Sequence, residues 1–292
     1  MPKQRQHRPT RKKKQPTPSK SIFIIALIAL IPICFGIYLY CQQTLPIHAT
    51  PHHRQEHQSS PATVYKQLHI PLSPTTQESQ IITHTGYTVS YNSTLKIPNW
   101  VSYELTRQET QGSEKRQDRF VADPAAEGPT ATNADYTRSG YDKGHMAPAA
   151  DMKWSHNAMK ESFYFSNICP QHPQLNRRGW KNLEEKIRDW AAADSALIII
   201  CGPIVEKGAQ TIGTNKVTVP PRFFKVILSP FATPMRAIGF LFDNQRALDP
   251  LPAYVVTVDS IEKLTGIDFF APLPDDIKNT IEKEADIRQW PH

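Results

Sequence analysis

Hydrophobic and polar residues alternate along much of the chain beyond residue 80. Residues 87–106, YTVSYNSTLKIPNWVSYELT, alternate in this way and are rich in β-branched and aromatic types, which predicts two strands broken at Pro98. Other apolar runs bounded by turn residues predict further strands at residues 162–170, 196–205, 222–230, 235–244 and 253–258. The chain therefore reads mainly as β-structure in this region.

A helical period appears between these strands. In residues 173–193 the apolar positions Leu175, Trp180, Leu183 and Ile187 recur on one face, which predicts a helix. Shorter helices are predicted at residues 260–266 and 275–290, and a long loop at residues 109–135. Many strands with few helices predict an α+β fold around a central, largely antiparallel sheet. We expect one domain over residues 81–292, which is long enough to bury a sizeable core.

An almost wholly apolar run, SIFIIALIALIPICFGIYLYC, occupies residues 21–41. It is long enough to span a bilayer as a helix, and Tyr38 and Tyr40 lie at its end, where interfacial aromatic residues belong. We expect a single transmembrane anchor here. Residues 42–80 are rich in Gln, His, Pro, Ser and Thr, and we expect a flexible linker.

Charge gives the expected orientation of this anchor. Eight of the 34 basic residues lie in residues 1–20, which contain no acid, while the net charge of the whole chain is +7. The positive-inside rule places this basic tail in the cytoplasm and the following domain on the extracytoplasmic side. A cleaved signal peptide is the main alternative, although no small-x-small cleavage site follows the run, and a mitochondrial presequence is a third option. The rest of the chain is nearly neutral, so nucleic-acid binding there would need a local cationic groove.

Three short runs near the centre carry residues suited to metal-assisted phosphodiester hydrolysis. They are YDKGHMAP at 141–148, SNICPQ at 166–171 and LNRRGWKNLE at 175–184. His145 can take a proton from water, because imidazole titrates near neutral pH. Asn176 and Glu184 lie eight positions apart on the predicted helix, so their directions differ by roughly 80° and both can face one groove. Amide and carboxylate oxygens suit Mg²⁺.

The same runs contain cations that can contact phosphate oxygens, namely Lys143, Arg177, Arg178 and Lys181. Each candidate also has an ordinary explanation. Asn176 can cap the helix, Glu184 can lie on a solvated face, and the cations can be surface charges. Spacing and composition alone do not separate a metal nuclease from these alternatives.

Two cysteines, Cys169 and Cys201, lie outside the apolar run, each at the end of a predicted strand. An exported domain permits a disulfide between them, and two buried free thiols are the alternative. A thiol hydrolase using Cys169 with His145 is a rival function, although no activating sequence surrounds this cysteine.

The central runs resemble the signature of the DNA/RNA non-specific endonucleases. This is the ββα-metal nuclease family, which includes mitochondrial endonuclease G and bacterial sugar-nonspecific nucleases. The resemblance rests on SGYDKGHMAPAAD, SNICPQ and LNRRGWKNLE, in this order, and extends over residues 84–285 through CGPIV, PPRFFKVIL and IEKLTGIDFF. It implies a ββα-metal nuclease fold.

The resemblance also implies roles for individual residues. His145 matches the general base, Asn176 the direct protein ligand of Mg²⁺, and Glu184 the acid that orients the waters of the metal. Asn167 matches an asparagine that supports the histidine region, and Asp142 opens the motif in a structural role.

Two cationic positions depart from the family pattern or are less certain. Lys143 stands where the family more often has arginine, and lysine keeps the charge but loses the bidentate fork. An upstream arginine belongs near the segment Phe120 to Asp123, where Arg116 is preferred over Arg119.

The implied activity is hydrolysis of both DNA and RNA to 5′-phosphate ends with Mg²⁺, and the resemblance leaves Mn²⁺ open as the alternative metal. Some family members are homodimers, so a homodimer is a further expectation left open by the resemblance. The alternatives are a catalytically inactive, membrane-tethered nucleic-acid-binding protein and an enzyme acting on small phosphoesters.

Overall fold

The computed structural model describes residue 65 and residues 67–291 of the chain. The basic tail, the predicted anchor at residues 21–41 and most of the predicted linker lie outside these residues. Among the helices that are described, none is both long and apolar enough to cross a membrane. The anchor therefore stays a prediction.

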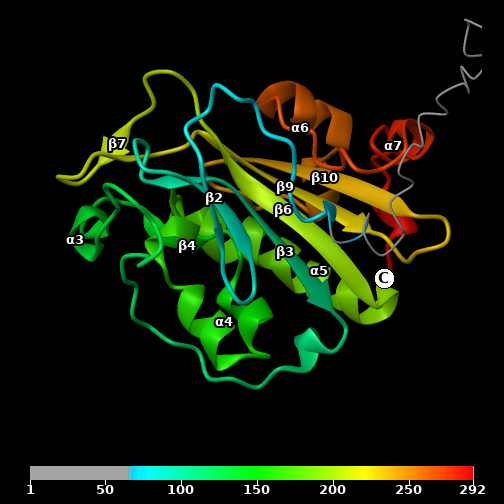
Figure 1. Cartoon of the computed structure of the whole chain (residues 1–292), viewed down its shortest axis with the longest axis horizontal. Coiled ribbons are helices and arrows are strands. Elements are labelled where there is room, and N and C mark those ends of the chain that lie inside the picture. The colour runs from blue at the N-terminus through cyan, green and yellow to red at the C-terminus, as the bar shows by residue number, and fades with distance from the viewer. Residues whose placement is uncertain (1–64, 66, 292) are drawn as a thin grey trace, which may run out of the picture. The chain divides into compact units, whose positions relative to one another are not determined.

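A seven-stranded antiparallel sheet forms the centre of the domain (Figure 1). Its strands, in spatial order, are β1 (Gln80–Thr83), β2 (Thr88–Asn92), β3 (Ile97–Thr106), β6 (Ala196–Ile204), β9 (Arg222–Ser229), β10 (Arg236–Asp243) and β11 (Val255–Val256). Two smaller two-stranded antiparallel sheets pair β4 (Asp142–His145) with β5 (Ile168–Gln171), and β7 (Thr211–Ile212) with β8 (Val217–Thr218). The predicted antiparallel α+β architecture is confirmed.

Helices and single turns connect and cover these strands. The longer ones are α4 (His156–Glu161), α5 (Trp180–Asp194), α6 (Val258–Thr265) and α7 (Asp275–Ile281). The shorter ones are η1 (Glu109–Gln111), α3 (Asn133–Tyr136), η2 (Ala149–Met152), η3 (Phe165–Asn167), η4 (Leu175–Gly179), η5 (Leu251–Tyr254) and η6 (Ile287–Gln289). The predicted helix at 275–290 is thus shorter than expected, and the predicted strand at 162–170 forms only from Ile168.

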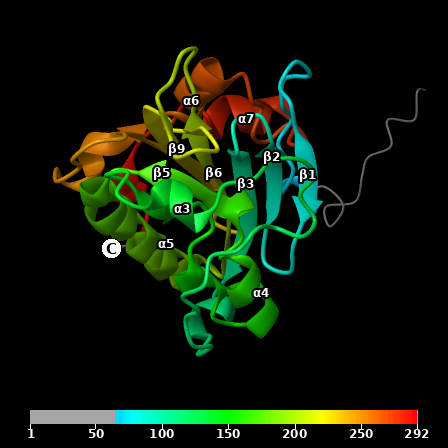
Figure 2. The same cartoon turned by 90° about the vertical axis from the view of Figure 1, so that its left-hand side faces the viewer.

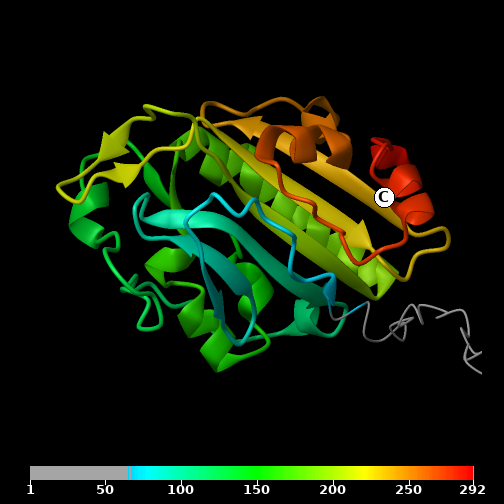
Figure 3. The same cartoon turned by 45° about the horizontal axis from the view of Figure 1, so that its top comes forward.

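The sheet separates two hydrophobic cores. Along β6, Ile199 and Cys201 pack with α5 on one face, while Ile198 and Ile200 pack with α6 on the other. This alternation follows from the two-residue period of a strand. Figures 2 and 3 show α5 on one side of the long strands and α6 with α7 on the opposite side. The paired strands β4 and β5, together with α5, form a ββα unit on the α5 side of the sheet.

Prolines do not break the strands as the sequence pattern suggested. Pro98 lies inside β3 opposite Tyr91, and the chain turns instead at residues 93–96. The register of β2 shifts next to this pair, and such an irregularity tolerates the missing N–H of proline. Likewise β6 continues through Gly202 and Pro203.

The ordered domain begins before residue 81, which corrects the predicted linker boundary. Leu68 is buried in the α6-side core, and Leu72 exchanges two backbone hydrogen bonds of 2.9 Å with Asp268. The Trp100 indole donates to Ser73 Oγ at 2.7 Å. Isolated apolar residues make these contacts, so the segment shows no periodicity that sequence inspection could detect.

Candidate active site

A pocket of about 400 Å³ lies over the ββα unit and gathers most of the predicted site residues. It is lined by Arg116, Lys143, His145, Pro148, Ala149, Ala150, Asn176, Arg177, Lys181, Glu184 and Arg188. Seven of these were predicted from the sequence, although they come from three separate segments of the chain. The ββα unit therefore brings a base, oxygen ligands and cations to one place.

His145 ends β4 and is almost fully buried, with a relative exposure of 9%. Its ring packs against Phe120 and Phe163, with centroids 5.3 and 5.0 Å away. Burial, with a further contribution from the charge of Arg116, lowers the pKa of His145 to about 3. Its Nε2 has no hydrogen-bond partner within the described part of the chain. The imidazole is therefore neutral at physiological pH and free to accept a proton.

Neighbouring residues fix the backbone around this histidine. The buried Asn167 side chain accepts a hydrogen bond from Ala147 N at 2.8 Å and donates to Ala147 O at 2.9 Å and Ser162 O at 2.8 Å. Gly144 leaves room for the buried Gln171 side chain, because a Cβ there would lie 2.0 Å from Gln171 Oε1. Asn167 thus acts as a positioning residue and does not line the pocket.

Asn176 and Arg177 lie on a single π-helical turn, η4, that leads into α5. Such turns are frequent at functional sites. Asp142 Oδ2 accepts a hydrogen bond from Asn176 Nδ2 at 3.0 Å, and the Arg177 guanidinium binds both oxygens of Asp142 at 2.7 Å. Asp142 therefore fixes the Asn176 amide with its nitrogen engaged, which leaves the amide oxygen available to a cation.

Glu184 lies on α5, facing the same pocket. Burial raises the pKa of this carboxyl to about 7, opposed by the positive charge of Lys225 and reinforced by the negative charge of Asp151. Lys225 is fully buried in β9, with its Nζ 4.4 Å from the centre of the Trp180 ring. Its Nζ has no hydrogen-bond partner among the described residues. A fixed buried cation thus lies beneath the pocket.

Arg188 was missed by sequence inspection. It lines the pocket, and its guanidinium donates to the buried Asp151 at 2.7 Å, while the Tyr103 hydroxyl donates to the other oxygen of Asp151 at 3.0 Å. A signal was present, because Arg188 follows Glu184 by four positions and therefore shares its helix face. Lys225 gave no such signal, since it lies in an apolar strand, more than 40 residues after Glu184 in the sequence.

The remaining predicted cations differ in position. The Lys143 Nζ donates to Asn133 Oδ1 at 2.8 Å and lies 4.5 Å from the Phe120 ring centre, and burial lowers its pKa. Arg116 lines the pocket, which supports its choice over Arg119. Lys181 also lines it. Arg178 is exposed and is not among the residues that line the pocket, so its predicted substrate contact stays a prediction.

The predicted cysteine pair is not bonded. Cys169 and Cys201 are both buried, free thiols. The Cys201 thiol donates to Met146 O at 3.2 Å. Burial raises the pKa of Cys169 well above its usual value and that of Cys201 to about 11. Neither thiol is therefore an activated nucleophile, which removes the thiol hydrolase hypothesis.

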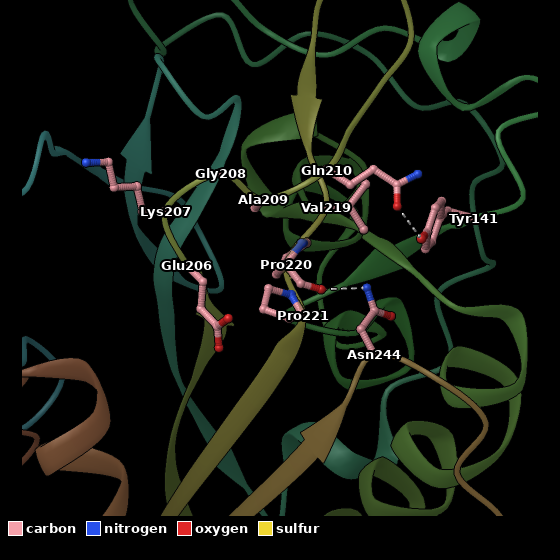
Figure 4. Close-up of a pocket in the computed structure, with 10 residues that line it drawn as sticks. All are labelled: Tyr141, Glu206, Lys207, Gly208, Ala209, Gln210, Val219, Pro220, Pro221 and Asn244. Atoms are coloured by element: carbon pink, nitrogen blue, oxygen red, sulfur yellow. Dashed lines mark hydrogen bonds between the residues drawn. The ribbon is translucent and has the colours of Figure 1, made fainter.

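A second pocket, of about 250 Å³, contains Tyr141, at the start of the β4–β5 unit, and Asn244 (Figure 4). Its main polar side chain is already satisfied, since Asn244 donates to Pro170 O and Pro220 O at 3.0 and 2.8 Å and accepts from His172 N at 2.7 Å. None of the predicted site residues lines it. The chemistry therefore belongs to the first pocket.

The oxygen donors of that first pocket fit Mg²⁺. The Asn176 amide, whose nitrogen donates to a neighbouring carboxylate and whose oxygen is left for a cation, shares the pocket with the Glu184 carboxylate, and together they form a hard and sparse ligand set. Mg²⁺ takes few protein ligands and keeps several waters, so Asn176 with Glu184 nearby is sufficient.

A family model described as DNA/RNA non-specific endonuclease matches residues 65–276. The chain belongs to this family. Mitochondrial nuclease EXOG of Mus musculus is 32% identical over 238 residues, covering 75% of this chain and 64% of the relative. Mitochondrial endonuclease G of Homo sapiens is 32% identical over 206 residues, covering 65% and 69%. A nuclease of Nostoc sp. is 32% identical over 223 residues, covering 72% and 80%.

Among solved structures, a crystal structure of the EndoG/EndoGI complex matches with a TM-score of 0.63 at 28% identity, covering 67% of this chain and 87% of that chain. The chain spans less than two thirds of the EXOG relatives from Mus musculus and Xenopus laevis, at 64% and 60% of their lengths. These similarities confirm the family inferred from the central runs and its α+β fold.

Proposed function

We propose that this protein is a Mg²⁺-dependent, sugar-nonspecific endonuclease that hydrolyses phosphodiester bonds of DNA and RNA to 5′-phosphate ends. One observation carries the proposal. A buried, neutral histidine, whose Nε2 has no hydrogen-bond partner among the described residues, shares a pocket with an oriented amide, a carboxylate and several cations. Membership of the DNA/RNA non-specific endonuclease family supports it.

His145 acts as the general base. Its Nε2 takes one proton from a solvent water while the water oxygen attacks phosphorus; the bond from phosphorus to the leaving 3′ oxygen breaks, and that oxygen takes a proton from solvent to become the 3′-hydroxyl. The lowered pKa of His145 keeps the ring neutral in the resting protein, so its Nε2 can accept a proton, and the same shift makes the imidazole a weaker base than a solvent-exposed histidine. Asn167 holds the backbone that aims the ring, and it takes no part in the proton transfer.

Cations neutralise the charge that develops on the phosphate. Lys143, Arg116 and Lys181 line the pocket and can contact phosphate oxygens. The Arg177 guanidinium donates to both carboxylate oxygens of Asp142, so the main role of Arg177 is to hold η4 in place. Contacts to the phosphate backbone carry no base information, which gives little sequence preference.

Asn176 would hold Mg²⁺, with Glu184 placed to orient water beside it, and Mn²⁺ would serve in its place. The bound ion supplies charge neutralisation at the scissile phosphate and stabilises the leaving oxygen. Because the attacking water comes from solvent, the sugar 2′-hydroxyl is not needed. Both DNA and RNA are therefore expected substrates.

End-group analysis tests this reaction. Purified protein is incubated with single-stranded RNA and with DNA oligonucleotides in Mg²⁺, and the products are separated by mass. We expect 5′-phosphate and 3′-hydroxyl ends from both, and no product from His145→Ala. Release of 2′,3′-cyclic phosphates from RNA would overturn the mechanism. Binding without cleavage by the folded protein would favour the inactive nucleic-acid-binding alternative.

The location of the enzyme is also proposed from the sequence. Residues 21–41 anchor the chain in a membrane with residues 1–20 in the cytoplasm and the nuclease domain on the extracytoplasmic side. Protease added to intact cells should remove the domain and leave a fragment that carries the basic tail. Complete protection in cells that remain intact would contradict this orientation.

A further inference from the structure

A cluster of carboxylates lies on the face of the sheet opposite the active site. It is formed by Asp259 and Glu262 of α6 and by Glu282, which caps the C-terminus of α7 (Figure 3 shows both helices). One carboxylate oxygen from each residue lies within 4.8 Å of those of the other two. Three negative charges at this separation repel one another unless a proton or cation joins them.

Glu282 is the residue that requires a partner. Its relative exposure is 4%, and its Oε1 has no hydrogen-bond partner among the described residues. Burial, followed by the charge of Glu262, raises the pKa of Glu282 to about 7. A buried carboxylate oxygen without a hydrogen-bond donor is energetically costly. Glu282 therefore needs a proton or a cation that the described residues do not supply.

The nearby cation of the protein is already committed. Lys278 Nζ binds the two oxygens of Asp268 at 2.7 and 2.6 Å. Glu262 uses one oxygen, Oε1, to accept from Phe269 N at 3.0 Å, which leaves its other oxygen for the cluster. Among the described residues none of the three carboxylates forms an ion pair, and the charge of Lys278 only partly opposes the raised pKa values of Glu262 and Glu282.

The cluster is held rigidly. Asp259 and Glu262 are three positions apart on α6 and so share a helix face. Asp259 N donates to the backbone oxygen of Glu282 at 3.1 Å, which joins the two helices directly. Ile261 and Ile281, each adjacent to a ligand candidate, are buried in the α6-side core. The three carboxylates thus keep their spacing without a bound ion.

We propose that Asp259, Glu262 and Glu282 bind a divalent cation, with Ca²⁺ preferred, and so fasten α7 to α6. The oxygen spacing is compatible, because two oxygens bound to one Ca²⁺ ion lie at most about 4.6–5.2 Å apart at usual Ca–O distances, and the three oxygens here lie within 4.8 Å of one another. Ca²⁺ accepts several carboxylates in irregular geometry, whereas Mg²⁺ usually takes one or two and keeps its waters. The site is separate from catalysis and does not depend on the proposed function.

Thermal unfolding with Ca²⁺ and direct titration test this site. The full chain should carry Asn176→Ala and Glu184→Gln, which remove the amide oxygen and the carboxylate charge that would hold a cation in the active-site pocket. In this background we compare three proteins: the parent, one with Glu262→Gln and one with Glu284→Gln. Glu284 is an exposed glutamate two positions beyond Glu282, so it controls for the same chemical change outside the cluster.

In EDTA at pH 8, Glu262→Gln should raise Tm, because it removes one of three repelling charges. Ca²⁺ at about ten times its dissociation constant should raise Tm of the parent and of Glu284→Gln by about 3 °C or more, with one ion bound per chain in calorimetry. Glu262→Gln should lose this response and the binding heat.

Two results would overturn the proposal. One is the absence of any Ca²⁺ response in the parent, which would mean that Glu282 is simply protonated. The other is an unchanged Ca²⁺ response in Glu262→Gln, which would place the ion elsewhere. Asp259→Asn provides a second variant with the same expected outcome if Glu262→Gln does not fold.

Discussion

Glu184→Gln should stabilise the domain at alkaline pH while it impairs catalysis. The carboxyl has a pKa of about 7 in the folded protein, against an ordinary value of 4.5 that the unfolded chain retains. A raised folded pKa contributes stability below pH 4.5, and this contribution is lost as pH rises through 7. Glutamine resembles the protonated acid at every pH. The stability gained by Glu184→Gln over the unsubstituted protein is therefore absent at pH 4.5 and complete near pH 8.5.

The size of this effect follows from the difference between 4.5 and about 7. At 1.36 kcal/mol per pH unit, that difference corresponds to about 3 kcal/mol. Because the side chain is partly exposed, solvent screening reduces the expected gain to about 1–2 kcal/mol. For a domain of this length, such a gain raises Tm by about 3–6 °C.

The assay is thermal and urea unfolding in EDTA at pH 5 and pH 8.5. Glu185→Gln is the matched control, because Glu185 is the exposed neighbour and makes only a surface ion pair of 3.3 Å with Lys181. It should change stability by less than about 0.5 kcal/mol. Lower stability of Glu184→Gln at pH 8.5 would refute the reasoning, since it would show that the carboxylate makes net favourable contacts.

Three further predictions follow from buried groups around the site. Asn167→Ala should destabilise the domain by about 2–4 kcal/mol, because the backbone groups buried around Asn167 lose their hydrogen-bond partners. Urea unfolding measures this loss, and a loss below about 0.5 kcal/mol would contradict the positioning role. Lys225→Met should raise the pKa of Glu184 further and shift the acid limb of the pH–rate profile to higher pH, and an unchanged limb would exclude electrostatic coupling. Iodoacetamide should leave Cys169 and Cys201 unmodified and activity intact, as mass spectrometry can check, because both thiols are buried and have raised pKa values.

Much of the fold and site could be predicted because their signals are local. The long strands are continuous apolar runs, and the catalytic candidates lie within three short runs that match a family signature in order. The paired strands β4 and β5 and the helix α5 place His145, Asn176 and Glu184 in one pocket, because these runs form a single ββα unit.

Features that depend on distant contacts could not be predicted. Pro98 stays within β3 because β2 changes register beside it. The register is set by the pairing of two strands and cannot be read from the sequence of one strand alone. The segment around Leu68 is ordered only through isolated contacts with the sheet and its α6-side core. Lys225 looks like an irregularity in a strand until the fold places it over Trp180 and beneath Glu184.

The proposed nuclease is tested most directly by incubating the purified protein with supercoiled plasmid and with RNA, in Mg²⁺ or EDTA, beside His145→Ala and Asn176→Ala. Circular dichroism would first establish that all three proteins are folded. We expect the unsubstituted protein to degrade both substrates only with Mg²⁺, and both variants to lose at least about 100-fold of this activity. Full activity in EDTA, or in folded His145→Ala, would contradict a metal-dependent mechanism with His145 as its base.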